Sequence, residues 1–419
     1  MYKKRKTPND VFTPRKPEVN DSMYVHRPDL EERLINAFNG TRHIIICGES
    51  GTGKSWLYKK VLKNQNIRFM AANLANASRL KSINAEFKNL VDREQKAVKT
   101  EYKEKKKFSA SGLLGFFGFG LSHEGLFKIS SKEPFEACLE FLSKKAKMQK
   151  SCLVLDNLEA IFNSNELMKE LADIILLLDD ERYGKYNVKI LIVGIPQNLK
   201  EYFLKIHNLS PVVNRLQEIP EVSRLELPQA KELIRKGFCD ELGYCVDSFE
   251  EVSRYICWVT DRIPEKIQDY CLELGLIAEK YSCIVDISLL EMADKNWLIK
   301  SLSSNYSVIE NLMNSRETSV GRRNQTLYAL GKFENNEFKY SDIETIIKAE
   351  FPTSTKSATI NVSGVLSDLE RKDNPIIKRT PKGDSFVFID PKYRMCLRAM
   401  LVKNEKEIVE KLDISTFQK

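Results

Sequence analysis

Residues Gly48–Ser55 read GESGTGKS, between the apolar run Ile44–Cys47 and a helix-compatible stretch, Trp56–Leu62. Glycines at three positions let the backbone fold around an anion without side-chain clashes. Successive N–H groups and the N-terminus of the following helix then direct partial positive charge at a phosphate group. A strand, a glycine-rich loop and a helix in this order are the setting that a Walker A phosphate loop requires. The stretch therefore predicts an NTP-binding loop rather than a chance glycine-rich turn.

The polar residues that end the loop predict a bound metal as well. Lys54 can reach the β- and γ-phosphates of a nucleoside triphosphate, and the Ser55 hydroxyl can bind Mg²⁺. ATP and Mg²⁺ are thus the expected cofactors.

An acidic residue ends a second apolar run, because Ser151–Leu155 reads SCLVL and is followed by Asp156. We expect this strand to run beside the loop strand, so that Asp156 faces the Mg²⁺ held by Ser55. The next residue is Asn157, and Glu159 lies three positions after Asp156. Glu159 is the candidate for polarising the attacking water. The alternative is an ordinary glutamate favoured by a helix N-terminus, in which case ATP would be bound tightly and hydrolysed slowly.

The length and composition of the chain indicate that it can form sizeable hydrophobic cores. Its 419 residues suit two to three domains at about 100–200 residues each, and 42% of them are hydrophobic. No run approaches the ~18 apolar residues of a membrane span, and no apolar signal-peptide segment is present. The nine cysteines include no CxxC pair, so we expect buried free thiols at Cys47 and Cys152 rather than zinc or disulfides. We expect a cytoplasmic protein.

The positive charge is concentrated at the front of the chain. Residues 1–16 carry six bases and one acid, a net of +5 out of the chain's +8. We expect residues 1–22 to be a disordered basic tail. The tail would anchor the protein to a phosphate backbone or an acidic partner, or would only keep it soluble.

Apolar runs alternate with helical patterns over residues 23–228. Besides the two runs above, we expect strands at Ile67–Ala71, Val188–Val193 and Arg224–Leu227. Unbroken apolar strands between helices predict a parallel α/β sheet covered on both faces. Residues 108–130 mix Gly with Phe and Leu, which favours a hairpin insertion; contact with a membrane or a partner is the alternative.

The remaining residues predict two further regions. Residues 229–320 follow helical patterns and are expected to form a lid and a connection. In residues 321–419 three helical patterns (Gln325–Phe333, Ser341–Ala349, Ala358–Arg371) precede two β-like segments, Ile376–Thr380 and Phe386–Ile389. Three helices and a β-wing predict a winged helix, followed by a C-terminal helix.

With these motifs in place, residues 24–275 resemble STAND-type and archaeal initiator-like AAA+ P-loop ATPases. The lead-in Tyr24–Leu34 is similar to theirs at Arg27, although His26 replaces a usual glycine. The spacing from Asp156 to Glu159 is closer to STAND enzymes. Residues 386–401, FVFIDPKYRMCLRAML, resemble the end of the winged-helix domain in archaeal-type STAND ATPases.

The resemblance implies further site residues. Gln197 or Asn198 would sense the γ-phosphate, Arg262 would be a second sensor, and Arg215 would be an arginine finger for a neighbouring subunit. For Arg215, a surface ion pair is the alternative. The expected nucleotide contacts are Gly48, Glu49, Ser50, Gly51, Thr52, Gly53, Lys54, Ser55, Trp56, Val25 and Arg27.

The function implied is an ATP-driven switch, often a homo-oligomer, of the kind found in anti-phage defence, transposition or replication control. Its winged helix would bind DNA through short polar and basic groups, namely Lys356, Ser357, Thr359, Asn361, Lys378, Arg379 and Lys382. Residues 322–398 carry 14 bases and 10 acids, which is only mildly basic. The alternative is an ATP-gated regulator of an effector protein, in which the winged helix is an intramolecular latch. No further catalytic constellation supports a metabolic enzyme, because the four histidines are scattered.

Overall fold

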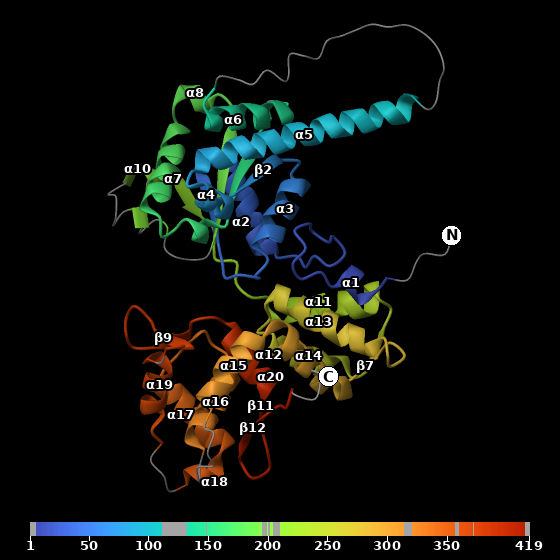
Figure 1. Ribbon diagram of the computed structural model, residues 1–419, viewed down its shortest axis with the longest axis vertical. Coiled ribbons are helices and arrows are strands. Elements are labelled where there is room, and N and C mark those ends of the chain that lie inside the picture. Colours follow the sequence, from blue (N-terminus) through green and yellow to red (C-terminus); the bar gives the residue numbers. More distant parts are fainter. Residues whose placement is uncertain are drawn as a thin grey trace. The chain divides into compact units, whose positions relative to one another are not determined.

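The computed structural model divides the chain into two compact units (Figure 1). The structure describes residues 6–110, 132–147, 149–194, 199, 202–203, 210–313, 321–356, 360–371 and 373–414. Pro17–Val19 and His26–Ser223 form the core unit. The C-terminal unit consists of Arg224 onward together with Asn20–Val25 and the described residues up to Lys16. The expected hairpin at 108–130 lies outside the described residues, apart from 108–110 at the end of a helix.

A five-stranded parallel sheet forms the centre of the core unit. Its strand order is β2-β3-β4-β1-β5, and every neighbouring pair is parallel. The strands are β1 (His43–Cys47), β2 (Arg68–Asn73), β3 (Ser151–Asp156), β4 (Val188–Gly194) and β5 (Leu216–Glu218). The predicted α/β sheet and four of its five strands are therefore confirmed.

Alternate side chains of the central strands enter two separate cores. Ile44 and Ile46 pack with α2 (Pro28–Asn39) and α3 (Lys54–Asn64) on one face. Ile45 packs on the other face, where the remaining helices of the unit lie. These are α4 (Leu74–Leu80), α5 (Ile83–Ala110), α6 (Pro134–Lys145), α7 (Asn165–Leu177), α8 (Glu181–Gly184) and α10 (Ser210–Asn214). Period-two alternation thus buries both faces of the sheet.

Two expectations about the strands are wrong. The strand that ends at Asp156 does not run beside the loop strand, because β4 lies between β3 and β1. All seven residues of β4 are buried, as a central strand requires. The fifth strand is Leu216–Glu218 rather than Arg224–Leu227. Leu227 instead begins α11 (Leu227–Arg235), whose first turn contains a proline and whose start is capped by a Glu226–Gln229 capping box.

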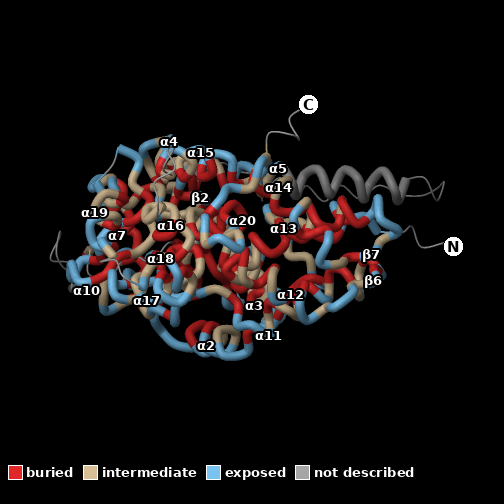
Figure 2. Tube along the Cα trace, turned by 90° about the horizontal axis from the view of Figure 1, so that it is seen from below, coloured by how far each residue is buried: buried red, intermediate tan, exposed pale blue. Residues whose placement is uncertain are grey.

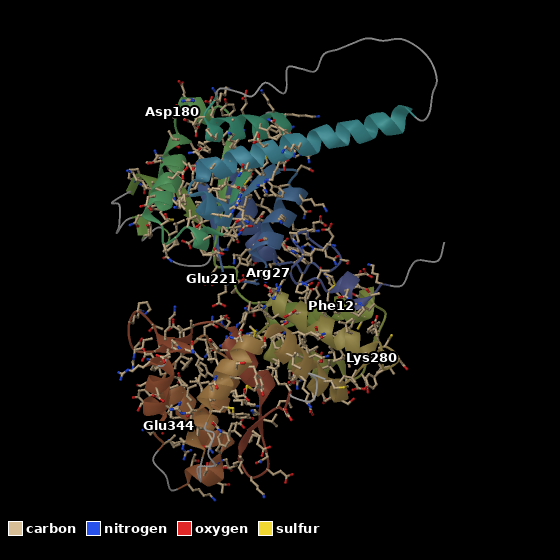
Figure 3. All side chains as sticks on the ribbon, in the orientation of Figure 1. Phe12, Arg27, Asp180, Glu221, Lys280 and Glu344 are labelled. Carbon is tan, nitrogen blue, oxygen red and sulfur yellow. The ribbon has the colours of Figure 1, made fainter. Side chains whose placement is uncertain are left out.

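The front of the chain is ordered where it is described, which corrects the expected disordered tail. Pro8–Val11 forms helix α1, and Phe12 after it is fully buried in the C-terminal unit (Figure 3). The Phe12 ring meets that of Phe238 edge-on, with centroids 5.0 Å apart. A side chain on Gly237 would overlap the Phe12 ring, so the glycine provides the slot for it.

Helices and small sheets make up the rest of the C-terminal unit. A π-helical stretch (Lys236–Glu241) follows α11, and short strands β6 (Cys245–Val246) and β7 (Ile284–Val285) pair with each other. Helices α13 (Pro264–Ala278) and α20 (Lys392–Met400) are buried along most of their length (Figure 2). The helices are α12 (Phe249–Val259), α13 (Pro264–Ala278), α14 (Leu290–Ser301), α15 (Ser303–Leu312), α16 (Arg322–Lys332), α17 (Tyr340–Glu350), α18 (Pro352–Thr355), α19 (Val362–Arg371) and α20 (Lys392–Met400).

Two antiparallel sheets accompany the last helices. β8 (Glu337–Phe338), β10 (Phe386–Phe388) and β9 (Ile377–Arg379) pair in that order. After α20 the chain forms a hairpin, β11 (Leu401–Lys403) with β12 (Val409–Lys411). All nine cysteines are free thiols, and Cys47 and Cys152 are buried as predicted. No helix in the described part of the chain is long and apolar enough to cross a membrane.

We predict that Phe12→Ala destabilises the C-terminal unit by about 3 kcal/mol, because it empties an aromatic slot that the surrounding backbone cannot close. Guanidinium unfolding of the whole chain measures this through tryptophan fluorescence, since Trp258 and Trp297 both lie in that unit. Asn9→Ala is the control, because Asn9 is exposed on the same short helix. Equal midpoints for the two variants would mean that Phe12 does not dock.

Candidate nucleotide-binding site

The glycine-rich loop connects β1 directly to α3. Helix α3 begins at Lys54, and Gly53 before it has φ 94°. Gly51 has φ 81°, so two glycines of the loop adopt the left-handed conformation that other residues avoid. The N–H groups at the start of α3 are thereby left facing the loop, which is the anion-binding arrangement expected from the sequence.

Gly48 is required by close packing rather than by backbone angle. A Cβ atom there would overlap the carbonyl group of Val222. The Gly48 N–H donates to the carbonyl oxygen of Gly194 at the end of β4 (3.2 Å), and the Val222 N–H donates to that of Cys47 (2.8 Å). The start of the loop is thus fixed to the end of β4 and to the segment that follows β5.

Arg27 supports the loop from the residue before α2 (Figure 3). Its guanidinium donates to the carbonyl oxygens of Thr52 (2.9 Å) and Ser223 (3.0 Å). The Arg27 N–H donates to Glu31 Oε1 (2.9 Å), which fixes the start of the helix. A nucleotide contact was expected of Arg27, and the contacts observed are with Thr52 of the loop, with Ser223 and with Glu31.

Lys54 lies among carbonyl groups and carboxylates. Its Nζ donates to the carbonyl oxygens of Gly48 (2.6 Å) and Glu49 (2.8 Å). Burial lowers the pKa of Lys54, and the negative charges of Glu159 and then Asp156 oppose that shift. Both predicted carboxylates therefore lie close enough to act on the lysine ammonium group.

Asp156 is held at both of its carboxylate oxygens. Oδ1 accepts from the N–H of Asn157 (2.9 Å), and Oδ2 accepts from the hydroxyl of Tyr58 (3.2 Å). Asn157 is left-handed (φ 64°), and its side chain donates to Asn73 Oδ1 at the end of β2 (3.0 Å).

The turn after Asp156 brings Glu159 back to the same edge of the sheet. Leu158–Ala160 form a short 3₁₀ helix, and the exposed Glu159 lies in its middle. Glu159 Oε2 lies 3.4 Å from the position that a Cβ on Gly194 would take. The loop after β1, Asp156 at the end of β3 and Gly194 at the end of β4 therefore meet where parallel strands end, which is the usual ligand-binding edge of an α/β sheet.

Three supporting residues were not predicted. Tyr58 lies one turn after Ser55 on α3, a spacing that the sequence already displays. Asn73 ends β2 and caps α4. Glu86 of α5 is completely buried and accepts from the Asn73 N–H (3.3 Å) and from Arg93 (2.9 Å). Nothing local in the sequence distinguishes Glu86 from the other acids of that helix.

Other predicted site residues lie elsewhere. Arg215 precedes β5 and so lies at the amino ends of the strands, opposite the loop. It forms an ion pair with Asp179 (Nε to Oδ2, 2.6 Å). Gln197 and Asn198 lie outside the described residues. Val25 and Arg262 belong to the C-terminal unit.

Arg262 follows a buried charge cluster in that unit. Asp261 is 5% exposed and pairs with Arg224 (2.8 Å), Arg398 (3.3 Å) and Arg394. Arg394 and Arg398 both come from α20, so the turn between α12 and α13 is bound to the C-terminal helix. Burial lowers the pKa of Arg398 to about 10, opposed by the charge of Asp261.

The residues that were expected to contact DNA differ in their hydrogen bonds, ion pairs and exposure. Asn361 accepts from the Gly364 N–H (3.0 Å) and therefore caps the start of α19. Arg379 pairs with Glu370 (3.2 Å), whereas Lys356, Lys378 and Lys382 are exposed. Ser357 and Thr359 lie outside the described residues.

Comparisons with known proteins agree with this geometry. Residues 38–203 match a family model described as an AAA domain. The Walker-type ATPase of Pyrococcus abyssi is 18% identical, with a TM-score of 0.52 over 93% of this chain and 99% of that one. Cdc6p of Pyrobaculum aerophilum (15%, TM-score 0.44) covers 93% and 96% of the two chains. ORC1 of Aeropyrum pernix, solved in complex with DNA (16%, 0.43), covers 94% and 96%. No curated protein matches the chain.

The fold class is thus a P-loop AAA+ fold. The AAA domain match includes the loop, Asp156 and Glu159, and the central sheet has the strand order that connects them. The fold of the chain is similar to that of the Walker-type ATPase of Pyrococcus abyssi.

We predict that Arg27→Met loosens the loop and lowers the free energy of unfolding by about 2 kcal/mol, because the buried carbonyl oxygen of Thr52 and the carbonyl oxygen of Ser223 lose a charged donor. Hydrogen exchange should become faster at residues 49–53 in particular. Arg33→Met is the matched control, since Arg33 is exposed on α2. Unchanged exchange in the Arg27 variant would contradict a supporting role.

Proposed function

We propose that this protein is an ATP-binding and slowly hydrolysing molecular switch that changes conformation or assembles when ATP binds. One observation carries the proposal: the loop, Lys54, Asp156 and Glu159 converge at one edge of the sheet. The chain resembles STAND-type ATPases in the spacing of the two carboxylates. A cytoplasmic role in anti-phage defence, transposition or replication control suits such a switch.

The residues present fit MgATP. The loop N–H groups and Lys54 would hold the phosphates, and the Ser55 hydroxyl and the Asp156 carboxylate are the hard oxygen ligands that Mg²⁺ prefers. Bound Mg²⁺ would neutralise charge that develops on the γ-phosphate. The negative charges of Glu159 and Asp156 act on Lys54 and oppose the lowering of its pKa by burial, which favours the cation that a phosphate requires.

Glu159 is the proposed base that orients the attacking water. It is exposed, and its position on the 3₁₀ turn directs it to the end of β4. In this chain the position directly after Asp156 is occupied by Asn157, whose amide is bonded to Asn73 (3.0 Å) and cannot accept a proton. Hydrolysis therefore depends on a carboxylate carried by a short turn, which favours slow turnover.

In an oligomer, Arg215 would act as an arginine finger. Because Arg215 lies at the edge opposite the loop, its guanidinium can serve only the nucleotide of a neighbouring subunit. Its ion pair with Asp179 would then have to open. Arg262 is the proposed second sensor, at a turn whose left-handed backbone is fixed by the Asp261 cluster.

The output of the switch is proposed to be DNA binding. Helices α16, α17 and α19 with the sheet β8-β10-β9 have the composition of a winged helix. Lys378 and Lys382 are exposed on its β9–β10 hairpin and would contact phosphates. Asn361 caps its own helix, so among the described residues few polar side chains remain to contact base edges. The binding would therefore depend only weakly on the DNA sequence.

A second candidate is a regulator of an effector protein, with the winged helix as a latch. The Asp261 cluster favours it, because α20 is bound to the α12–α13 turn by two buried arginines. In this case the surface exposed when the latch opens would be recognised by a protein partner.

Removing the two principal charges should separate binding from hydrolysis. We expect Lys54→Ala to weaken ATP binding by about 100-fold, because the phosphates lose their cation. We expect Glu159→Gln to bind ATP within about twofold of the parent chain and to lose about 100-fold in turnover, because the amide cannot take a proton. Fluorescent-nucleotide titration and phosphate release measure the two effects.

Glu181→Gln is the matched control for the loss of a carboxylate, because Glu181 is exposed at the start of α8. Unchanged turnover in Glu159→Gln would leave Glu159 as an ordinary residue of a helical turn.

The wing lysines should set the salt dependence of duplex binding. With ATP present, Lys378→Ala/Lys382→Ala should lower affinity at low salt and reduce the slope of log K against log salt by about 2. Lys280→Ala/Lys406→Ala removes the same charge at exposed positions of the C-terminal unit and should leave the slope unchanged. No duplex binding by the parent chain at low salt would favour the latch.

A further inference from the structure

We infer that Tyr58 is a positioning residue for the metal-binding carboxylate, holding Asp156 in place from the helix that also carries Ser55. The inference rests on the proposed function, because it concerns how MgATP would be bound. The contact that suggests it is the hydrogen bond from the Tyr58 hydroxyl to Asp156 Oδ2, 3.2 Å long.

Tyr58 and Ser55 lie on the same face of α3. They are three residues apart in a helix that begins at Lys54, so both point in nearly the same direction. The Tyr58 hydroxyl reaches the end of β3, and the shorter Ser55 hydroxyl lies one turn nearer the loop. One rigid helix therefore sets the positions of the serine ligand and of the group that holds the aspartate ligand.

The strand order explains why such a link is needed. β4 separates β1 from β3, so no main-chain hydrogen bond joins the loop strand to the strand of Asp156. Tyr58 provides a direct side-chain connection from α3, the helix that follows the loop, to Asp156 at the end of β3. The second carboxylate oxygen is fixed by the Asn157 N–H at 2.9 Å, and the two bonds together define one orientation of the carboxylate.

The surroundings of Tyr58 hold its ring rigidly. Its side chain is 1% exposed, and its ring meets that of Phe69 edge-on with centroids 6.0 Å apart. The buried ring therefore keeps the hydroxyl against Asp156 Oδ2.

The test measures metal affinity rather than turnover. Tyr58→Phe keeps the ring and removes only the donor. Mn²⁺ binding to the full chain with a non-hydrolysable ATP analogue, followed by electron paramagnetic resonance, should weaken about tenfold, as is usual when a residue supporting a metal ligand is lost. Affinity for the fluorescent ATP analogue without metal should stay the same.

Two further variants separate positioning from stability. Phe69→Leu disturbs the same ring packing and leaves the hydroxyl, so it should lower the melting temperature without changing Mn²⁺ affinity. Asp156→Asn and the double variant Asp156→Asn/Tyr58→Phe should bind Mn²⁺ equally weakly, because Tyr58 acts through Asp156.

Each remaining outcome overturns the inference. Parental Mn²⁺ affinity in Tyr58→Phe, or a Phe69→Leu variant that loses Mn²⁺ affinity as strongly, would reduce Tyr58 to a core residue. If the parent chain binds no nucleotide at all, the proposed function fails and this inference with it. Nucleotide binding by the parent with an unaffected Tyr58→Phe variant would overturn the inference alone.

Discussion

The register of β4 against its two neighbours is the constraint on which the candidate site depends. Gly194 pairs with Cys47 on one side, and Ile192 pairs with Leu155 on the other, so the ends of three strands lie nearly level. A slip of one residue would turn every side chain of a strand to the opposite face, and Asp156 would leave the site. The register is fixed by two cores at once, because neighbouring residues of each strand enter different clusters.

The sequence predicted the elements of this sheet better than their order. Apolar runs such as SCLVL and VKILIV mark strands because both faces of a parallel sheet are buried. Such a run does not indicate which strand it pairs with in the sheet. For that reason β3 was expected beside β1. β5 was missed because its three residues, LQE, contain one apolar side chain. Arg224–Leu227 has strand-like alternation, but the proline after Leu227 starts a helix.

The residues of the candidate site also fall into two groups, those that the sequence indicates and those that it does not. The loop, Asp156 and Glu159 could be predicted because their chemistry depends on local spacing. Tyr58 and Glu86 could not, since their roles come from partners in other elements, such as Asp156 for Tyr58. Phe12 shows the same limit outside the site. Its segment is polar and basic, which predicts disorder, yet its ring fills a slot beside Gly237, a residue 225 positions away.

The turn that carries Arg262 is determined by charge rather than by local preference. Asp261 and Arg262 have φ angles of 53° and 57°, and a left-handed residue other than glycine costs about 1–3 kcal/mol. Such a backbone persists only where its surroundings fix it. Three arginines surround the Asp261 carboxylate, and the Leu225 N–H donates to the Arg262 carbonyl oxygen (3.0 Å). Buried charge clusters add little net stability but specify one geometry. Because two of the arginines belong to α20, the conformation of the proposed sensor turn depends on the C-terminal helix, and a movement of that helix would act on Arg262 through Asp261.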